Sequence, residues 1–218
     1  MMKLAEYRRT ASRLADYLPW VALVGEGVVL NKDGSFQRTA KFRGPDLDSA
    51  VAAELVAVAG RLNNAFRRLG SGWAIFVEAQ RSEAATYPAS IFPDAASALV
   101  DAERKADFEE EGSHFVSGYF LTLLWLPPAE NAARSESWLY EGHETSGVNP
   151  WEQVRGFIDR TDRVLALLDG FMPDCHWLDD AATLTYLHST ISTNRHRVRV
   201  PEVPVYLDAL LPDQALAG

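Results

Sequence analysis

Residues 36–43, FQRTAKFR, alternate apolar and polar positions more regularly than any other part of the chain. Successive side chains of an extended chain point to opposite faces, so this period of two predicts a strand with one dry and one wet face. Residues 31–34, Asn-Lys-Asp-Gly, supply a turn before it, because Asp and Gly tolerate turn conformations. Residues 44–46, Gly-Pro-Asp, stop the strand and open a helix. The stretch 15–48 is therefore predicted to be a β-hairpin followed by a helix start.

Apolar residues recur at intervals of three or four in several other segments, which is the spacing of one helix face. The predicted helices are 1–18, 45–69, 94–110, 150–168 and 179–192, followed by a short helical tail that ends near 211. The predicted strands besides 36–43 are 73–80, 114–126 and a brief one at 175–178. Residues 129–149 are polar and predict a loop.

Two features of this order define the fold class. Strand 114–126 is apolar on both faces, which predicts a central strand covered on both sides. The opening hairpin is incompatible with an all-parallel sheet. We therefore predict an α+β fold, in which one mixed, mostly antiparallel sheet is packed by several amphipathic helices.

Composition limits the possible functions. With 218 residues, 47% of them hydrophobic, the chain can bury a large core, and we expect residues 1–218 to form a single module. A formal net charge of −9 argues against a general nucleic-acid binder. Cys175 is the one cysteine and cannot form an internal disulfide. The longest apolar run, 120–126, is far shorter than a membrane span. These observations predict a cytoplasmic chain.

Candidate metal and catalytic residues all have simpler interpretations. Cys175, His176 and His188 do not provide the paired clusters of four ligands that zinc requires, so we predict no metal site. Asp179 or Asp180 is better explained as a helix cap than as an acid–base pair with Asp174. Asp180, His188 and Ser189 are the residue types of a hydrolase triad. No G-x-S-x-G motif accompanies them, so no catalytic residue is named.

A basic row and a group of aromatic residues are the candidate interaction residues. Alternation in an extended segment sends Arg195, Arg197 and Arg199 to one side, where they would attract an anionic partner. The alternative is a solvated strand edge whose charges prevent unwanted pairing. The aromatic residues in or beside the polar loop are either interface anchors or part of the core. They are Trp138, Tyr140 and Trp151.

The chain resembles a known family over essentially its whole length. The matching stretches agree in order and spacing, and lie at 15–48, 61–81 (RLNNAFRRLGSGWAIFVEAQR), 114–130 (HFVSGYFLTLLWLPPAE) and 177–211. They resemble the N-terminal region of conjugal transfer ATPases of the TrbE/CagE/VirB class, the motors of type IV secretion. The resemblance implies that a RecA-like ATPase domain follows a region such as this one.

That ATPase domain is not in this sequence. A phosphate-binding loop has the pattern G-x-x-x-x-G-K-[ST], and no Gly-Lys pair occurs anywhere in the chain. We therefore expect no cofactor in this chain, with ATP and Mg²⁺ needed only by the ATPase domain of a longer protein. We also expect that this chain does not hydrolyse ATP alone.

Two hypotheses follow. In the first, which the resemblance favours, the chain is a non-catalytic interaction module of a conjugation motor. It would be peripherally associated with the bacterial inner membrane, and would dock the motor to inner-membrane channel proteins, its own C-terminal ATPase domain or further copies of itself. In the second, the chain is a free-standing small enzyme or ligand-binding domain. Its site would then lie around Asp174, His176 and His188.

Overall fold

The computed structural model describes residues 13–84, 86–110, 114–128, 150–203 and 205–215. Within these residues the chain forms one six-stranded sheet and six helices. The strands are β1 (Trp20–Gly25), β2 (Val28–Asn31), β3 (Phe36–Arg43), β4 (Trp73–Glu83), β5 (Phe115–Trp125) and β6 (Asp174–Trp177). The helices are α1 (Leu14–Tyr17), α2 (Ala52–Phe66), α3 (Ala95–Glu110), α5 (Pro150–Asp169), α6 (Asp180–Ile191) and α7 (Leu207–Ala215).

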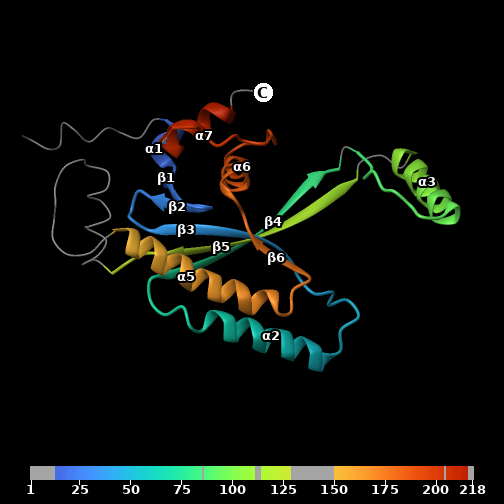
Figure 1. Ribbon diagram of the computed structural model, residues 1–218, viewed down its shortest axis with the longest axis horizontal. Helices are drawn as coiled ribbons and strands as arrows, with labels where there is room; N and C mark the ends of the chain where they lie inside the picture. The colour runs from blue at the N-terminus through green and yellow to red at the C-terminus, as the bar shows by residue number, and fades with distance from the viewer. Residues whose placement is uncertain (1–12, 85, 111–113, 129–149, 204, 216–218) are drawn as a thin grey trace, which may run out of the picture.

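The sheet has helices on both of its faces. The strand order is β1-β2-β3-β5-β4, and β6 pairs with β3 beside the end of β2. Every pairing between described strands is antiparallel, which confirms the α+β class. Helices α2 and α5 cover one face, while α1, α6 and α7 cover the other (Figure 1). β1 and β4 form the two outer edges of the main path.

β3 confirms the predicted strand 36–43, but the predicted wet face is wrong for its first half. All residues from Phe36 to Ala40 are buried, because α6 and its neighbours cover the face that carries the polar residues. Thr39 there hydrogen-bonds Thr122 of β5, with 2.9 Å between the hydroxyl oxygens. On the opposite face the Arg38 guanidinium is also buried, and donates to Asp162 of α5 at 2.6 Å. The Thr39 hydroxyl and one guanidinium nitrogen of Arg38 are thus hydrogen-bonded, which lowers the cost of burying these polar side chains.

The helix predicted from residue 45 begins later, at Ala52. Asp46 accepts a hydrogen bond from the backbone of Asp48, an arrangement that holds the chain in a turn and competes with helix. The helix then starts where Glu54 reaches back, its carboxylate accepting the Val51 backbone N–H at 3.0 Å. Proline permits a helix start but does not enforce one.

The first hairpin is joined to the start of α6 by Gly27. This residue has φ +64°, and its backbone N–H donates to the Asp180 carboxylate at 2.7 Å. An added Cβ would lie 2.2 Å from the carbonyl oxygen of Leu178, so only glycine fits. Asp179 is the N-cap of α6 and accepts the Ala182 N–H at 2.7 Å, which confirms the predicted cap.

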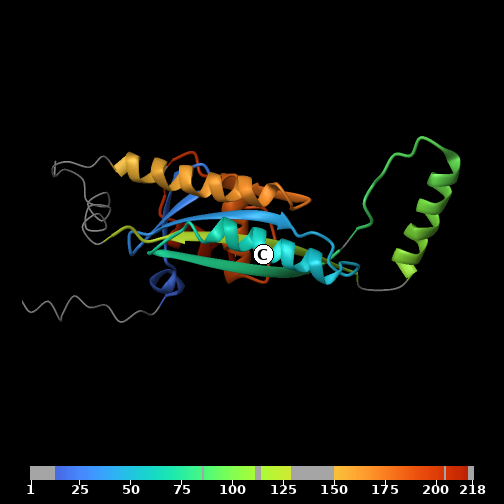
Figure 2. The ribbon, with the colours of Figure 1, turned by 90° about the horizontal axis from the view of Figure 1, so that it is seen from below.

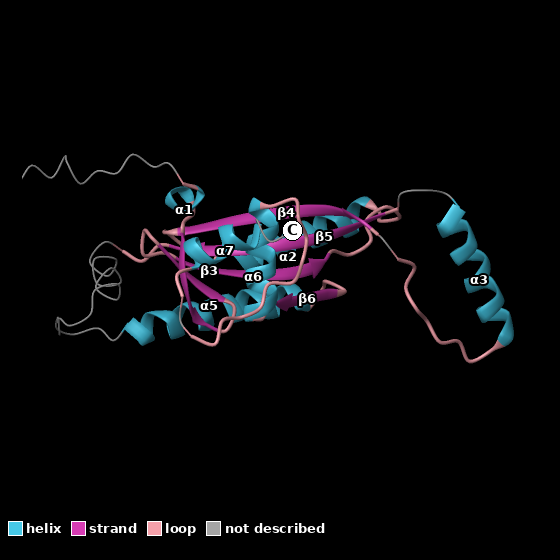
Figure 3. Cartoon of the chain, turned by 90° about the horizontal axis from the view of Figure 1, so that it is seen from above, coloured by secondary structure: helices cyan, strands magenta, loops and turns pink. Residues whose placement is uncertain are grey.

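Strands β4 and β5 extend beyond the helical layers. Their pairing runs from Trp73 opposite Trp125 to Glu83 opposite Phe115. Burial on β5 is confined to its inner half, Leu121–Trp125, so the prediction of a fully covered strand is wrong for the outer half. Helix α3 lies past the outer end, away from the sheet, and has no buried residue (Figures 2 and 3).

Candidate binding groove

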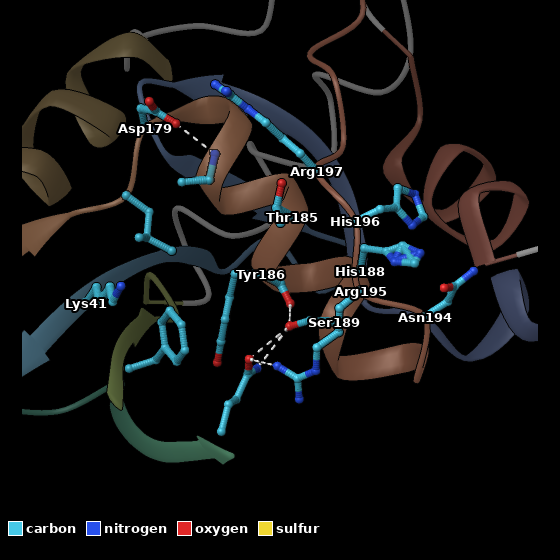
Figure 4. Close-up of a pocket in the computed structure, with 14 residues that line it drawn as sticks. Lys41, Asp179, Thr185, Tyr186, His188, Ser189, Asn194, Arg195, His196 and Arg197 are labelled. Carbon is cyan, nitrogen blue, oxygen red and sulfur yellow. Dashed lines mark hydrogen bonds between the residues drawn. The ribbon is translucent and has the colours of Figure 1, made fainter. Parts of the chain in front are cut away.

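A groove lies between α6, the segment 193–200 and the sheet, and has a volume of about 540 Å³. We call it the α6 groove. Its floor is made of Phe120, Leu178, Ala182 and Tyr186, and its rim carries Lys41, Arg195 and Arg197. Figure 4 shows Lys41 across the groove from Arg195, with Tyr186 between them.

The floor is apolar because a strand, a helix and the short connection before that helix each contribute hydrophobic side chains. Phe120 of β5 lies opposite Lys41 of β3 in the antiparallel pairing, so both side chains emerge on the α6 face. The Phe120 and Tyr186 rings are in contact, with 4.6 Å between their centroids. Leu178 is buried, and precedes the cap of α6. The result is an aromatic surface with a cation at its edge.

Gln80 of β4 organises the polar end of the groove. Its amide donates to the Ser189 hydroxyl at 2.9 Å, and its carbonyl oxygen accepts from the Arg195 guanidinium at 3.0 Å. Ser189 in turn donates to the backbone carbonyl of Tyr186 at 2.6 Å. These bonds connect an edge strand, a helix and the segment that follows it. They fix Arg195 in place.

The basic segment is held along α6 by one buried residue and one backbone contact. Val198 is buried in the core, and its N–H donates to the Thr185 hydroxyl at 3.0 Å. Arg195, Arg197 and Arg199 are exposed on either side of Val198. Asn194 and Val200 are exposed as well, so the placement of the three arginines on one side of the segment stays a prediction. The strand-edge interpretation is wrong, because residues 193–200 pair with no described strand.

Positive charge on the rim is not neutralised by the described residues. Among them, Lys41 and Arg197 have neither an ion pair nor a side-chain hydrogen bond, and Arg195 contacts only the neutral Gln80. The one carboxylate in the described lining is that of Asp179, which already accepts the Ala182 N–H. A second carboxylate, that of Glu78, lies beside the lining and accepts from Gln80 at 2.9 Å and from Tyr186 at 2.8 Å. The groove is thus a local basic site on a chain of formal charge −9.

The titratable groups of the groove are not set up for acid–base catalysis. Burial raises the pKa of Tyr186 to about 12, so its hydroxyl stays protonated, and it donates to Glu78 at 2.8 Å. Burial, together with the neighbouring His196, lowers the pKa of His188 below its usual value, which keeps this ring neutral. Its Nε2 is buried with no hydrogen-bond partner among the described residues. A protonated phenol cannot accept a proton. The neutral imidazole of His188 is the basic form of histidine, but its Nε2 is hydrogen-bonded to no described hydroxyl or thiol, so no nucleophile is paired with it.

The residues weighed for metal binding do not come together in one site. His176 pairs with Asp174 at 2.9 Å on exposed β6, and neither lines the groove that contains His188. Burial raises the pKa of Cys175 to about 11, so its thiol is unreactive at neutral pH. The described residues contain no group of three or more side chains placed to hold a metal ion.

The other predicted residues fall in different places. Asp180 contacts Gly27 and therefore does not join Ser189 and His188 as a triad. Trp151 is exposed at the start of α5 and does not line the groove. Trp138 and Tyr140 lie outside the described residues.

Sequence reasoning singled out Arg195 and Arg197, and weighed Asp179, His188 and Ser189 in other roles, but it did not find the remaining lining residues. Lys41 had a readable signal, since it sits on the polar side of the alternation in 36–43. Gln80, Phe120 and Tyr186 had none, because they come from separate elements that only the tertiary structure brings together.

A second exposed surface follows β4. Its outer edge pairs with no strand in the described region of the chain, and Ile75, Phe76 and Val77 are all exposed. Leu55 and Val56 of α2 are exposed as well. Exposed apolar residues along an unpaired strand are typical of a surface that contacts another protein.

The family described as "Type IV secretion system ATPase VirB4/TrbE, N-terminal domain" matches residues 27–133. The first portion of a probable conjugal transfer protein TrbE from Sinorhizobium fredii (strain NBRC 101917 / NGR234) is 42% identical over 130 residues, which are 58% of this chain and 87% of that protein. The chain belongs to the VirB4/TrbE family. The matched region covers β2 to β5, and so includes Lys41, Gln80 and Phe120 of the groove.

A longer relative shows that this chain corresponds to one region of a larger protein. A "Conjugal transfer protein TrbE" from Rhizobium radiobacter is 32% identical over 235 aligned positions, covering the whole chain but only 29% of the relative's length. The chain therefore represents the N-terminal domain of a type IV secretion ATPase. No described helix is both long enough and apolar enough to cross a bilayer.

Proposed function

We propose that this chain is a non-catalytic contact module, which docks the secretion motor to the inner-membrane proteins of the channel, to its own ATPase domain or to other subunits. The observation that carries the proposal is the combination of exposed binding surfaces with the lack, among the described residues, of any reactive constellation. The surfaces are the unpaired edge of β4 and the α6 groove. Neither brings a nucleophile to a base.

Charge and sequence support the same proposal. The chain has no phosphate-binding Gly-Lys loop, so we expect ATP and Mg²⁺ to bind only to the ATPase domain of a longer family member. Its net charge of −9 disfavours nucleic acid as the principal partner. Peripheral association with the cytoplasmic side of the bacterial inner membrane would then come from protein contacts.

A pull-down tests the proposal. The tagged chain is incubated with detergent-solubilised inner-membrane channel subunits of its own transfer system and, separately, with the matching ATPase domain. We expect at least one of them to be retained. If the native chain, folded by circular dichroism, retains neither a channel subunit nor the ATPase domain and also does not bind an untagged copy of itself, the proposal is overturned.

A charge-reversal variant localises the contact. Arg195→Glu, Arg197→Glu and Arg199→Glu together remove the basic row, and we expect weaker retention of a partner that uses it. The matched control reverses three exposed cations elsewhere: Arg67→Glu, Lys105→Glu and Arg155→Glu. Equal loss in both variants would show a general charge effect and remove the basic row from the proposal.

A further inference from the structure

The α6 groove combines two kinds of binding surface that recognise different parts of one ligand. The floor presents the Phe120 and Tyr186 rings beside Leu178, and so fits an apolar side chain. The rim presents Lys41 and Arg197, which have no acidic partner among the described residues. An occupant with negative charges on either side of an apolar group would satisfy both.

The rim cations need an external anion to be neutralised. The chain carries 30 acidic against 21 basic residues, yet the described residues place no carboxylate against Lys41 or Arg197. Arg195 donates from one guanidinium nitrogen to Gln80, and has further N–H groups for a carboxylate. Carboxylates meeting such a rim gain charge-assisted hydrogen bonds.

Nucleic acids, membrane surfaces and acidic protein segments all carry negative charge, and the charge distribution of the chain distinguishes between them as occupants of the groove. A nucleic acid carries charge over a long range and would be repelled by a chain of net charge −9. A membrane surface is broad, and cannot bring anionic headgroups into a concave groove without approaching the acidic surface around it. A short acidic stretch of a protein needs complementarity only at the groove itself, so the charge distribution favours it.

We propose that the α6 groove binds an acidic peptide segment of a partner protein. Its carboxylates contact Lys41, Arg195 and Arg197, and one of its apolar side chains packs on Phe120 and Tyr186. The buried Nε2 of His188 adds an unpaired polar group to the wall of the groove. This inference rests on the proposed docking function, and gives the chemistry of one partner.

Fluorescence anisotropy with a labelled peptide that alternates glutamate with leucine and phenylalanine is the direct test. We expect saturable binding that weakens as salt is raised, and loss of binding when glutamine replaces glutamate or serine replaces the apolar residues. Equal binding of the glutamine peptide would overturn the role of the rim. Equal binding of the serine peptide would overturn the role of the floor.

Arg197 and Arg199 provide a matched pair of variants. Both are exposed and two residues apart in one segment, but only Arg197 lines the α6 groove. We expect Arg197→Glu to weaken peptide binding about tenfold and Arg199→Glu by about twofold or less. Ala182→Trp, which fills the floor, should weaken binding without changing the charge. Equal effects of the two arginine variants would indicate long-range attraction and overturn the groove as the site.

Competing ligands complete the experiment. Single-stranded oligothymidylate and phosphatidylglycerol vesicles are titrated under the same conditions, and binding of either that is lost in Arg197→Glu while the peptide fails would replace the proposal. If the peptide fails but the pull-down retains a partner, the docking function stands and only the acidic segment is rejected. If the pull-down fails and the peptide binds, the groove remains a binding site without the proposed partners.

Discussion

The two halves of β5 show how one strand can serve stability at one end and remain available for contact at the other. In the inner half, Leu121 and Leu123 are buried against α2 and α5. In the outer half, Phe115, Val116 and Tyr119 are exposed although they continue the same pairing with β4. Both halves have the same backbone pairing, so they differ in whether helices cover them.

The inner half of β5 therefore contributes to folding, while the outer half is available for contact with other molecules. Burial of apolar surface supplies most of the favourable free energy of folding, so the inner half should dominate stability. The outer half makes few such contacts and can change with little cost. Four experiments compare covered and exposed regions of the molecule, and the first should have the largest effect.

Leu123→Ala should destabilise the fold strongly, while Val116→Ala on the same strand should not. Leu123 is fully buried, and truncating a buried leucine costs about 2–5 kcal/mol in the free energy of unfolding. Val116 is 57% exposed, and we expect a loss of about 1 kcal/mol or less. Urea unfolding monitored by tryptophan fluorescence measures both. Equal losses would mean that the ribbon folds as one evenly stabilised unit.

The rate of thiol modification compares the covered part of the sheet with the outer half of β5. Cys175 is buried with a pKa of about 11 against an ordinary value of 9.0, so its thiolate fraction at neutral pH is reduced about 100-fold. In Cys175→Ala/Val116→Cys the one thiol moves to the exposed outer half. We expect it to react with a disulfide reagent at least about 100-fold faster than the native thiol. Similar rates would show that Cys175 is accessible in the folded chain.

The histidine behind the groove should make stability depend on pH. The pKa of His188 is lowered in the folded state below 6.5, so the unfolded chain binds the proton more readily. This contribution to stability is fully present above about pH 6.5 and is lost as pH falls through the lower folded pKa. His188→Leu removes the titration, and the urea midpoint should then fall less between about pH 7.5 and pH 5.5. An unchanged pH dependence in the variant would contradict the assignment.

Removal of α3 and its connections should have the smallest effect. Glu83 and Phe115 are directly paired, so Asn-Gly in place of residues 84–114 would close a two-residue hairpin. Because α3 buries no side chain, the free energy of unfolding should change by less than about 1 kcal/mol. Urea unfolding measures this change, and the pull-down shows whether a partner needs α3. A large loss of stability would place α3 in the folding unit.

Local sequence signals predicted the elements whose determinants lie close together in the chain. The strand at 36–43 and the Asp179 cap of α6 are confirmed, since each depends on neighbouring residues. The helix start at 45 is wrong because Asp46 bonds within its own turn and Glu54 caps the later start. The presence of Pro45 alone does not predict which of these hydrogen bonds forms.

The sequence by itself determined the family, the α+β class and the cap of α6 by Asp179. These properties depend on the order and spacing of residues that are close together in the chain. Only the tertiary structure decided that the polar face of β3 would be covered by α6, and that Lys41 would lie across an aromatic floor from Arg195. The physical reason is that burial and grooves arise between segments far apart in the chain, whose packing no single segment specifies.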